Sequence, residues 1–169
     1  MKLPEGYRYS AIYAGIRKIP KDDLALIVSD KPASAAAVFT QNRVQAAPVK
    51  LCRRHLSASR GAVGAILVNA GNANCATRTG DAVALACCRS AARLLRLPVT
   101  QVLPASTGVI GVPLPLEKIL RALPLITRHQ RPSARSFAEL SLAICTTDTR
   151  PKTASASFKM AGKRVHFVG

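Results

Sequence analysis

Apolar runs that are rich in aromatic and β-branched residues predict β-strands in the first half of the chain. Four segments have this character: Tyr7 to Ile16, Leu24 to Val28, Ala35 to Thr40, and Ala62 to Asn69. The last segment is the most apolar, and we expect it to be buried on both faces of a sheet. It leads directly into Ala70 to Asn74, a cluster of residues that favours a turn.

The spacing of apolar residues then changes to that of a helix. Residues 81–97 predict a helix that ends before Pro98. Its apolar stripe contains Leu85, Cys88, Ala92 and Leu95, and a second stripe contains Arg89, Arg93 and Arg96. An acidic residue near the beginning and arginines near the end suit the helix dipole. We interpret the arginines as a surface exposed to solvent or to a partner.

Two shorter helices are predicted further along the chain. The first, Leu116 to Leu123, lies between Pro115 and Pro124. For the second, Ser133 is a candidate N-cap, and the helix continues to about Ile144. The apolar spacing places three side chains on its buried side: Phe137, Leu140 and Ile144.

The C-terminal stretch returns to strand character. Ser155 to Met160 and Lys163 to Val168 flank Ala161-Gly162, a two-residue connection typical of a β-hairpin. Strands, then helices, then a hairpin, without regular βαβ repetition, predict a mixed α+β fold built from packed layers. We find no internal repeat or linker, and we interpret residues 1–169 as a single domain.

The composition limits the class of protein. Apolar residues make up 49% of the chain, which argues against disorder, and no apolar run approaches the ~18 residues that a membrane span requires. The N-terminal residues lack the apolar core of a secretory signal. We therefore expect a soluble, globular, cytoplasmic protein without membrane association.

The charge is strongly positive, because 25 Lys and Arg against 8 Asp and Glu give a formal net charge of +17. Nucleic acid, an acidic membrane, anionic small-molecule substrates or an acidic partner chain could each balance this charge. The basic residues are scattered, aromatic residues are only 4% and Trp is absent, which disfavours nucleic acid. We favour an acidic partner chain.

Metal and nucleotide chemistry find no support in the sequence. The five cysteines and three histidines show no ligand-like spacing, and neither a phosphate-binding loop nor a dinucleotide fingerprint is present. The odd number of cysteines indicates no disulfide framework. We assign no metal ligand and give the histidines no role.

Three clusters of small polar residues carry the candidate chemistry: Asn69 to Asn74, Ser106-Thr107-Gly108, and Thr146 to Lys152. In the second cluster, a threonine hydroxyl and a backbone N–H can converge on one developing negative oxygen. From spacing alone, an ordinary turn is the simpler interpretation. The third cluster offers polar groups for an amino-acid substrate, and a capped turn explains it equally well. The first cluster favours little more than a closed turn.

Taken together and in this order, the clusters closely resemble the ornithine acetyltransferase family, the bifunctional glutamate N-acetyltransferases of arginine biosynthesis. The resemblance extends over nearly the whole chain. It is carried by Gly15 to Lys18, Asp23 to Ile27, Ala36 to Asn42, Ala46 to Val49, Asn69 to Asn74, Ser106 to Gly111, and Ala143 to Lys152. It implies the mixed α/β layered sandwich of this self-cleaving family.

The resemblance implies acyl transfer through a covalent intermediate. Members of the family cut themselves between an alanine and a threonine, and the new N-terminal threonine of the β chain moves acetyl from N-acetylornithine to glutamate. Thr107 and Gly108 match the family's oxyanion-hole pair. Thr147 best matches a substrate-binding threonine, and Thr146 and Thr149 are the alternatives. No cofactor is implied, although some members accept acetyl-CoA as the acetyl donor.

The chain ends before the family's Lys-Gly-Ser-Gly-Met stretch and its Ala-Thr cleavage site. We therefore interpret it as most of an α subunit that a β chain completes, in an α2β2 heterotetramer that binds small substrates and no nucleic acid. Two other interpretations stay open. One is an aminopeptidase of the same broad self-cleaving fold, against which Thr146 to Lys152 argues. The other is a basic nucleic-acid-binding or assembly protein without catalysis.

Overall fold

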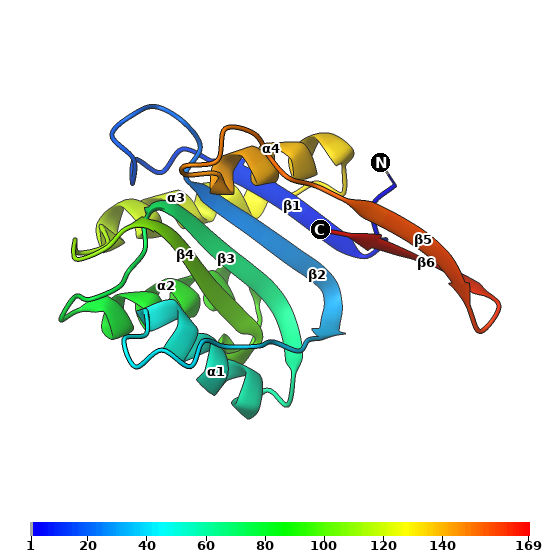
Figure 1. Cartoon of the computed structure of the whole chain (residues 1–169), viewed down its shortest axis with the longest axis horizontal. Helices are drawn as coiled ribbons and strands as arrows, with labels where there is room; N and C mark the ends of the chain where they lie inside the picture. The colour runs from blue at the N-terminus through cyan, green and yellow to red at the C-terminus, as the bar shows by residue number, and fades with distance from the viewer. Residues whose placement is uncertain (1) are drawn as a thin grey trace.

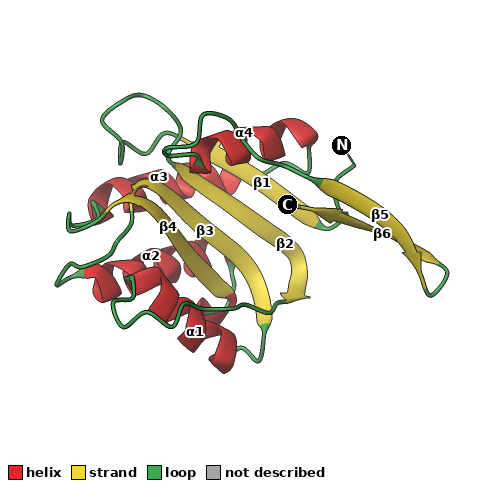
Figure 2. Cartoon of the chain, in the orientation of Figure 1, coloured by secondary structure: helices red, strands yellow, loops and turns green. Residues whose placement is uncertain are grey.

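In a computed structural model that describes residues 2–169, a four-stranded sheet is flanked by helices, and a two-stranded hairpin extends away from it (Figures 1 and 2). In chain order the elements are β1 (Tyr7–Ile12), β2 (Leu24–Ser34), α1 (Ala47–Ala58), β3 (Ala62–Asn72), α2 (Gly80–Leu95), η1 (Val99–Gln101), β4 (Val102–Val109), α3 (Leu116–Arg128), α4 (Ala134–Ile144), β5 (Ser155–Met160) and β6 (Lys163–Val168). The predicted mixed α+β layered fold is confirmed.

The sheet has the strand order β1-β2-β3-β4. The pairs β1/β2 and β2/β3 are antiparallel, whereas β3 and β4 are parallel. Parallel neighbours need a crossover connection, which α2 and η1 supply. As a result, β3 and β4 end side by side, with Asn69 opposite Ser106 and Gly71 opposite Gly108. Two clusters that are distant in the sequence therefore become neighbours.

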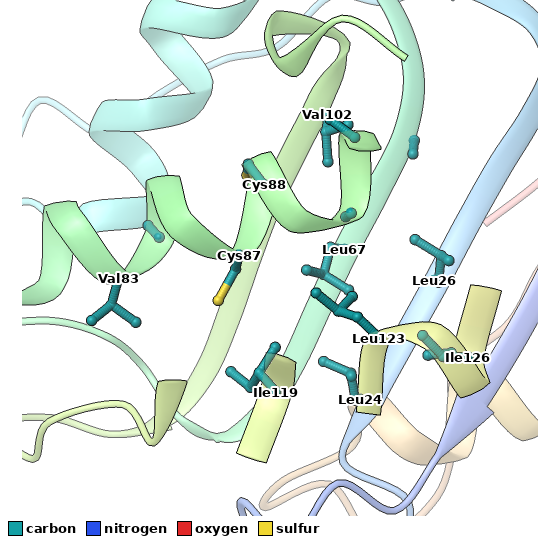
Figure 3. Close-up of a cluster of buried hydrophobic side chains, with 14 of the residues drawn as sticks. Leu24, Leu26, Leu67, Val83, Cys87, Cys88, Val102, Ile119, Leu123 and Ile126 are labelled. Atoms are coloured by element: carbon teal, nitrogen blue, oxygen red, sulfur yellow. The ribbon is translucent and has the colours of Figure 1, made fainter. Parts of the chain in front are cut away.

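One face of the sheet carries the main core, beneath α1, α2 and α3 (Figure 3). Alternate residues of a strand point to the same face, and on β2 these are Leu24 and Leu26, both fully buried. The apolar stripe of α3 packs against them through Ile119, Leu123 and Ile126. This face accounts for most of the apolar surface that folding buries.

The opposite face is covered over only part of its area. There α4 packs on β1 and β2, where the Tyr9 and Phe137 rings meet edge to face with centroids 5.2 Å apart. The expectation that β3 is buried on both faces is wrong for this side. Ile66 and Val68 point to it and are only half-buried; Val68 packs at the edge of the cluster under α4, which does not enclose it.

The predicted strand from Ala35 to Thr40 is also wrong. After the Ala35 N–H donates to the carbonyl of Gly61, the chain leaves the sheet, and Val38 is completely exposed. Local hydrogen bonds replace the strand ladder: the Asn42 N–H donates to the Thr40 hydroxyl, and such bonds compete with regular structure.

The predicted ends of α2 and α4 are confirmed, and the predicted end of α3 is wrong. For α2 the prediction is confirmed: Cys88 and Ala92 of its apolar stripe are buried, Leu85 and Leu95 are half-buried, and its arginines are exposed. The helix α3, however, continues past Pro124 to Arg128. Pro124 lies on the exposed side, and burial of Leu123 and Ile126 outweighs the loss of one backbone donor.

The cap of α4 is confirmed, since the Ser133 hydroxyl accepts a hydrogen bond from the Ser136 N–H at 3.1 Å. Phe137 and Leu140 are buried as predicted, but Ile144 is exposed. It lies in the last turn, beyond the part of α4 that packs on β1, and it faces the cleft described below.

The C-terminal hairpin has the predicted strands and connection. All six residues of β5 are exposed, and the rings of Phe158 and Phe167 stack on each other at 5.0 Å. Over residues 2–169, no helix is both long enough and apolar enough to cross a membrane.

Candidate active site

A cleft of about 370 Å³ lies on the less covered face, where β3 and β4 end near the C-terminus of α4. One wall is formed by the sheet and the other by the end of α4 and the segment after it. The residues that line it are Val68, Ala105, Ser106, Thr107, Ser141, Ile144, Cys145, Asp148, Arg150 and Lys152. The second and third clusters of the sequence analysis therefore face each other, although about 40 residues separate them.

In the sheet wall, two neighbouring hydroxyls differ in their bonding. The Ser106 hydroxyl donates to Oδ1 of Asn69 on the adjacent strand at 2.5 Å. Among residues 2–169, no side-chain hydrogen bond engages the Thr107 hydroxyl, which stands at the cleft. A hydroxyl left free in a cleft is available to a ligand, so the structure distinguishes Thr107 from Ser106.

Gly108 follows Thr107 with φ +130°, in contact with the neighbouring strand rather than with the cleft. A Cβ at this position would lie 2.3 Å from the carbonyl carbon of Gly71, which is closer than any van der Waals contact allows. The glycine thus permits close approach of β3 and β4. This reason for a glycine is structural, because no other residue fits between the two strands here.

The asparagine cluster at the end of β3 is a buried network. Nδ2 of Asn69 donates to the carbonyl of Asn72 at 2.7 Å, Nδ2 of Asn72 donates to the carbonyl of Val112 at 3.0 Å, and the Asn74 N–H donates to Oδ1 of Asn72 at 2.8 Å. All three asparagines are buried. As the sequence suggested, the cluster closes the connection, and it also fixes the end of β3 behind Ser106.

The opposite wall begins at Cys145, the C-cap of α4, whose thiol donates to the carbonyl of Ser141 at 3.2 Å. Beyond it, Asp148 and Lys152 form an exposed ion pair. The hydrogen bond between the two side chains and the opposite charge of each partner lower the pKa of Asp148 and raise the pKa of Lys152. Both groups are therefore ionised near neutral pH. Arg150 adds a further positive charge to the cleft.

Thr147 lies in this segment and is exposed, but it is not among the residues that line the cleft. The segment does line the cleft through Asp148, Arg150 and Lys152, none of which had an assigned role. The sequence indicated these three residues only as members of the third cluster, Thr146 to Lys152. Residues 2–169 contain no group of His, Cys, Asp and Glu placed to hold a metal ion.

Comparison with known proteins identifies the family. A family model described as the ArgJ family matches residues 8–169. The chain belongs to the ArgJ family. It is 49% identical over 166 residues to the arginine biosynthesis bifunctional protein ArgJ of Thermus thermophilus, and 43% identical over 170 residues to the protein of the same name from Nitratidesulfovibrio vulgaris. Each comparison covers 98% of this chain and 42% of the relative, so the chain spans about two-fifths of these ArgJ sequences.

Solved ArgJ structures confirm the fold. The arginine biosynthesis bifunctional protein ArgJ of Bacillus halodurans superposes with a TM-score of 0.92 at 33% identity, over 98% of this chain and 85% of that chain. The ornithine acetyltransferase of Mycobacterium tuberculosis, solved in complex with ornithine, superposes with a TM-score of 0.88 at 31% identity, over 98% and 88%.

Proposed function

We propose that this ArgJ chain forms one wall of an N-acetyltransferase site that moves acetyl from N-acetylornithine to glutamate. In the first step, a hydroxyl attacks the acetyl carbonyl carbon, the C–N bond breaks, and the proton passes to the leaving amine of ornithine. In the second step, the amine of glutamate attacks the ester, the C–O bond breaks, and the hydroxyl regains its proton. Acetyl-CoA enters only as an alternative acetyl donor, and no resident cofactor is needed because the hydroxyl carries the acetyl group.

The observation that carries this proposal is the free hydroxyl of Thr107 at the cleft, followed by Gly108. Both steps pass through a tetrahedral oxyanion. A hydroxyl and a backbone N–H that are fixed before the reaction stabilise such a charge, and one donor contributes about 3–4 kcal/mol in comparable sites. The network behind Ser106 holds this end of β4 in place.

The opposite wall suits the substrates. N-acetylornithine and glutamate both carry an α-carboxylate, and Arg150 and Lys152 contribute positive charge to the cleft. Thr147 adds a hydroxyl to the same segment. The Mycobacterium tuberculosis relative was solved with ornithine bound, which supports an ornithine-derived substrate here.

We further propose that the attacking threonine belongs to a β chain from the same precursor, in an α2β2 assembly. The chain spans 85% and 88% of the two solved ArgJ chains but only about 42% of the curated sequences, as expected if ArgJ is divided into two chains. Two groups of exposed apolar residues are surfaces for such a partner: Phe158, Met160 and Phe167 on the hairpin, and Val109, Ile110 and Val112 at and just beyond the end of β4.

The test uses this chain together with the rest of its ArgJ polypeptide and measures ornithine release from N-acetylornithine with glutamate as acceptor. Thr107→Ala should lower kcat about 10²- to 10³-fold. Thr100→Ala is the matched control. Thr100 lies in η1, just before the N-terminal end of β4 and far along the strand from Thr107, so this variant should keep the wild-type rate.

An undiminished rate in Thr107→Ala removes the oxyanion assignment. No acetyl transfer by the wild-type protein removes the proposed reaction itself. Native mass spectrometry of the same preparation should show two chains, and a single uncleaved chain that is active contradicts the division into α and β.

A further inference from the structure

Arg17 lies outside the cleft but contacts both of the structures that form its walls. Its Nη2 donates to the carbonyl of Ala143 at 2.9 Å and to the carbonyl of Cys145 at 2.5 Å, across more than 120 residues of sequence. Its Cγ packs against Gly71 of β3, so closely that a Cβ added to Gly71 would lie 2.8 Å from this atom. One side chain therefore packs on β3 and binds the end of α4.

The carbonyls that Arg17 binds are those that a helix leaves without partners at its C-terminus. The last turn of α4 contains no basic residue of its own. A guanidinium from the N-terminal part of the chain thus satisfies these acceptors and places a positive charge at the negative end of the helix dipole. No carboxylate among residues 2–169 forms an ion pair with it, so its side-chain hydrogen bonds all serve this helix end.

The backbone of Arg17 is itself fixed. The carboxylate of Asp23, which is buried, accepts the N–H of Arg17 at 2.8 Å and that of Ala14 at 2.7 Å. The carbonyl of Asp23 accepts the N–H of Ala70 on β3 at 2.8 Å. The loop that carries Arg17 is therefore held at the end of β3, one residue before Gly71.

The other side of this contact leads to the proposed oxyanion donors. Gly71 pairs with Gly108, where an added Cβ would lie 2.3 Å from the carbonyl carbon of Gly71, whereas a Cβ added at Gly71 would meet the side chain of Arg17. Arg17 therefore packs against Gly71, and Gly71 packs against Gly108. At its far end, the guanidinium fixes Cys145, where the segment with Asp148, Arg150 and Lys152 begins.

We propose that Arg17 is a positioning residue that sets the separation of the two cleft walls. It holds the substrate-binding segment after α4 at a fixed distance from Thr107 and Gly108 without touching the substrate. This inference rests on the proposed acetyl transfer for its kinetic part, while its structural part can be measured without any activity.

The experiment replaces Arg17 by methionine, which keeps an unbranched stem against Gly71 and removes the guanidinium. Loss of two charge-assisted hydrogen bonds should raise KM for N-acetylornithine about ten- to a hundredfold, with a smaller change in kcat because Thr107 and Gly108 stay in place. Lys18→Met is the matched control: it removes one exposed positive charge at the next position and should leave KM unchanged.

A second measurement follows the thiol of Cys145, a buried residue whose carbonyl accepts a hydrogen bond from the guanidinium. In Arg17→Met, its alkylation by iodoacetamide, resolved by peptide mass spectrometry, should become at least about tenfold faster. The thiol of Cys88, fully buried in the main core, should stay unlabelled and reports that the protein is folded. If Cys88 also labels, Arg17→Lys, which keeps the charge and a shorter donor, takes the place of the methionine variant and should give intermediate values.

In an active enzyme, a change in KM without faster labelling of Cys145, or faster labelling without a change in KM, overturns the positioning role. Unchanged values for both overturn it as well. If the wild-type protein transfers no acetyl but Cys145 labels faster in the variant, Arg17 does fix the segment and only the proposed reaction fails.

Discussion

The two faces of the four-stranded sheet differ in how far this chain covers them. Beneath α1, α2 and α3, Leu24 and Leu26 of β2 are completely buried. On the other face, α4 covers Tyr9, whereas Val68 and Thr107 remain at an open cleft. Both faces have apolar strand residues, so the alternation alone does not reveal which is complete. We infer that the first face provides stability, and the proposed function gives the second face its apolar residues as a surface for substrate and further ArgJ polypeptide.

The largest effect is expected for Gly108→Ala, because Gly108 permits the close packing of β4 on β3 and also follows Thr107 in the proposed site. In Gly108→Ala, the new Cβ meets the backbone of Gly71, and φ +130° disfavours alanine, so the ends of β3 and β4 must separate. We expect a loss of more than about 3 kcal/mol in the free energy of unfolding, together with loss of acetyl transfer. Urea denaturation and the ornithine-release assay measure the two effects.

Gly111→Ala is the matched control, since Gly111 also has positive φ but nothing lies within 4 Å of its added Cβ. Its destabilisation should be about 1 kcal/mol. Equal effects at the two glycines would show that close contact of β3 with β4 is unimportant.

A second prediction isolates the covered face. Leu123→Ala removes a fully buried side chain of α3 and should lower the free energy of unfolding by about 2–5 kcal/mol. Activity per folded molecule should be unchanged, because Leu123 faces away from the cleft. In the same helix, Leu125→Ala alters an exposed leucine and should change stability by less than about 0.5 kcal/mol. A large loss of activity in folded Leu123→Ala would contradict the separation of roles.

A third prediction concerns the incomplete side of the molecule. Replacing Phe158 and Phe167 by alanine removes a stacked aromatic pair from the exposed hairpin. The thermal midpoint of this chain alone should change little, whereas its affinity for the rest of the ArgJ polypeptide should fall about tenfold or more. Titration calorimetry with the separately produced remainder measures that affinity. If it is unaffected, the hairpin is not part of the proposed interface.

The smallest expected effect is a pH dependence from the covered face. Burial raises the pKa of Cys87 from 9.0 to about 12. Between pH 9 and 12 the unfolded chain releases this proton while the folded chain keeps it, so stability is complete below pH 9 and falls as the pH rises. At pH 10 the loss of stability caused by Cys87 is about 1 kcal/mol. Cys87→Ala should reduce the decline in urea stability between pH 8 and pH 10 by that amount, and an equally steep decline would count against it.

The sequence predicted those parts of the fold that local chemistry determines. The hairpin has its expected limits because strand-forming residues flank a two-residue connection, and Ser133 caps α4 because its hydroxyl reaches a neighbouring N–H. The errors have tertiary causes. Burial of Leu123 and Ile126 keeps α3 helical through Pro124, and no sheet neighbour is available to hold Ala35 to Thr40 as a strand.

The candidate site shows the same limit. The clusters around Thr107 and Thr147 were visible as motifs and do lie near one cleft. That they face each other depends on the parallel pairing of β3 with β4 and on the placement of α4, which no local pattern contains. Arg17 gave no signal as a contact of α4, because its partners are backbone carbonyls more than 120 residues away.

The buried asparagines at the end of β3 have a consequence for the shape of the proposed site. The side chains of Asn69 and Asn72 are already bound to neighbouring backbone groups, so the sheet wall has its working shape before a ligand arrives. In the proposed reaction, the acyl donor and the acyl acceptor would then enter the same cleft in turn, against a sheet wall that keeps the reacting carbonyl in the same place.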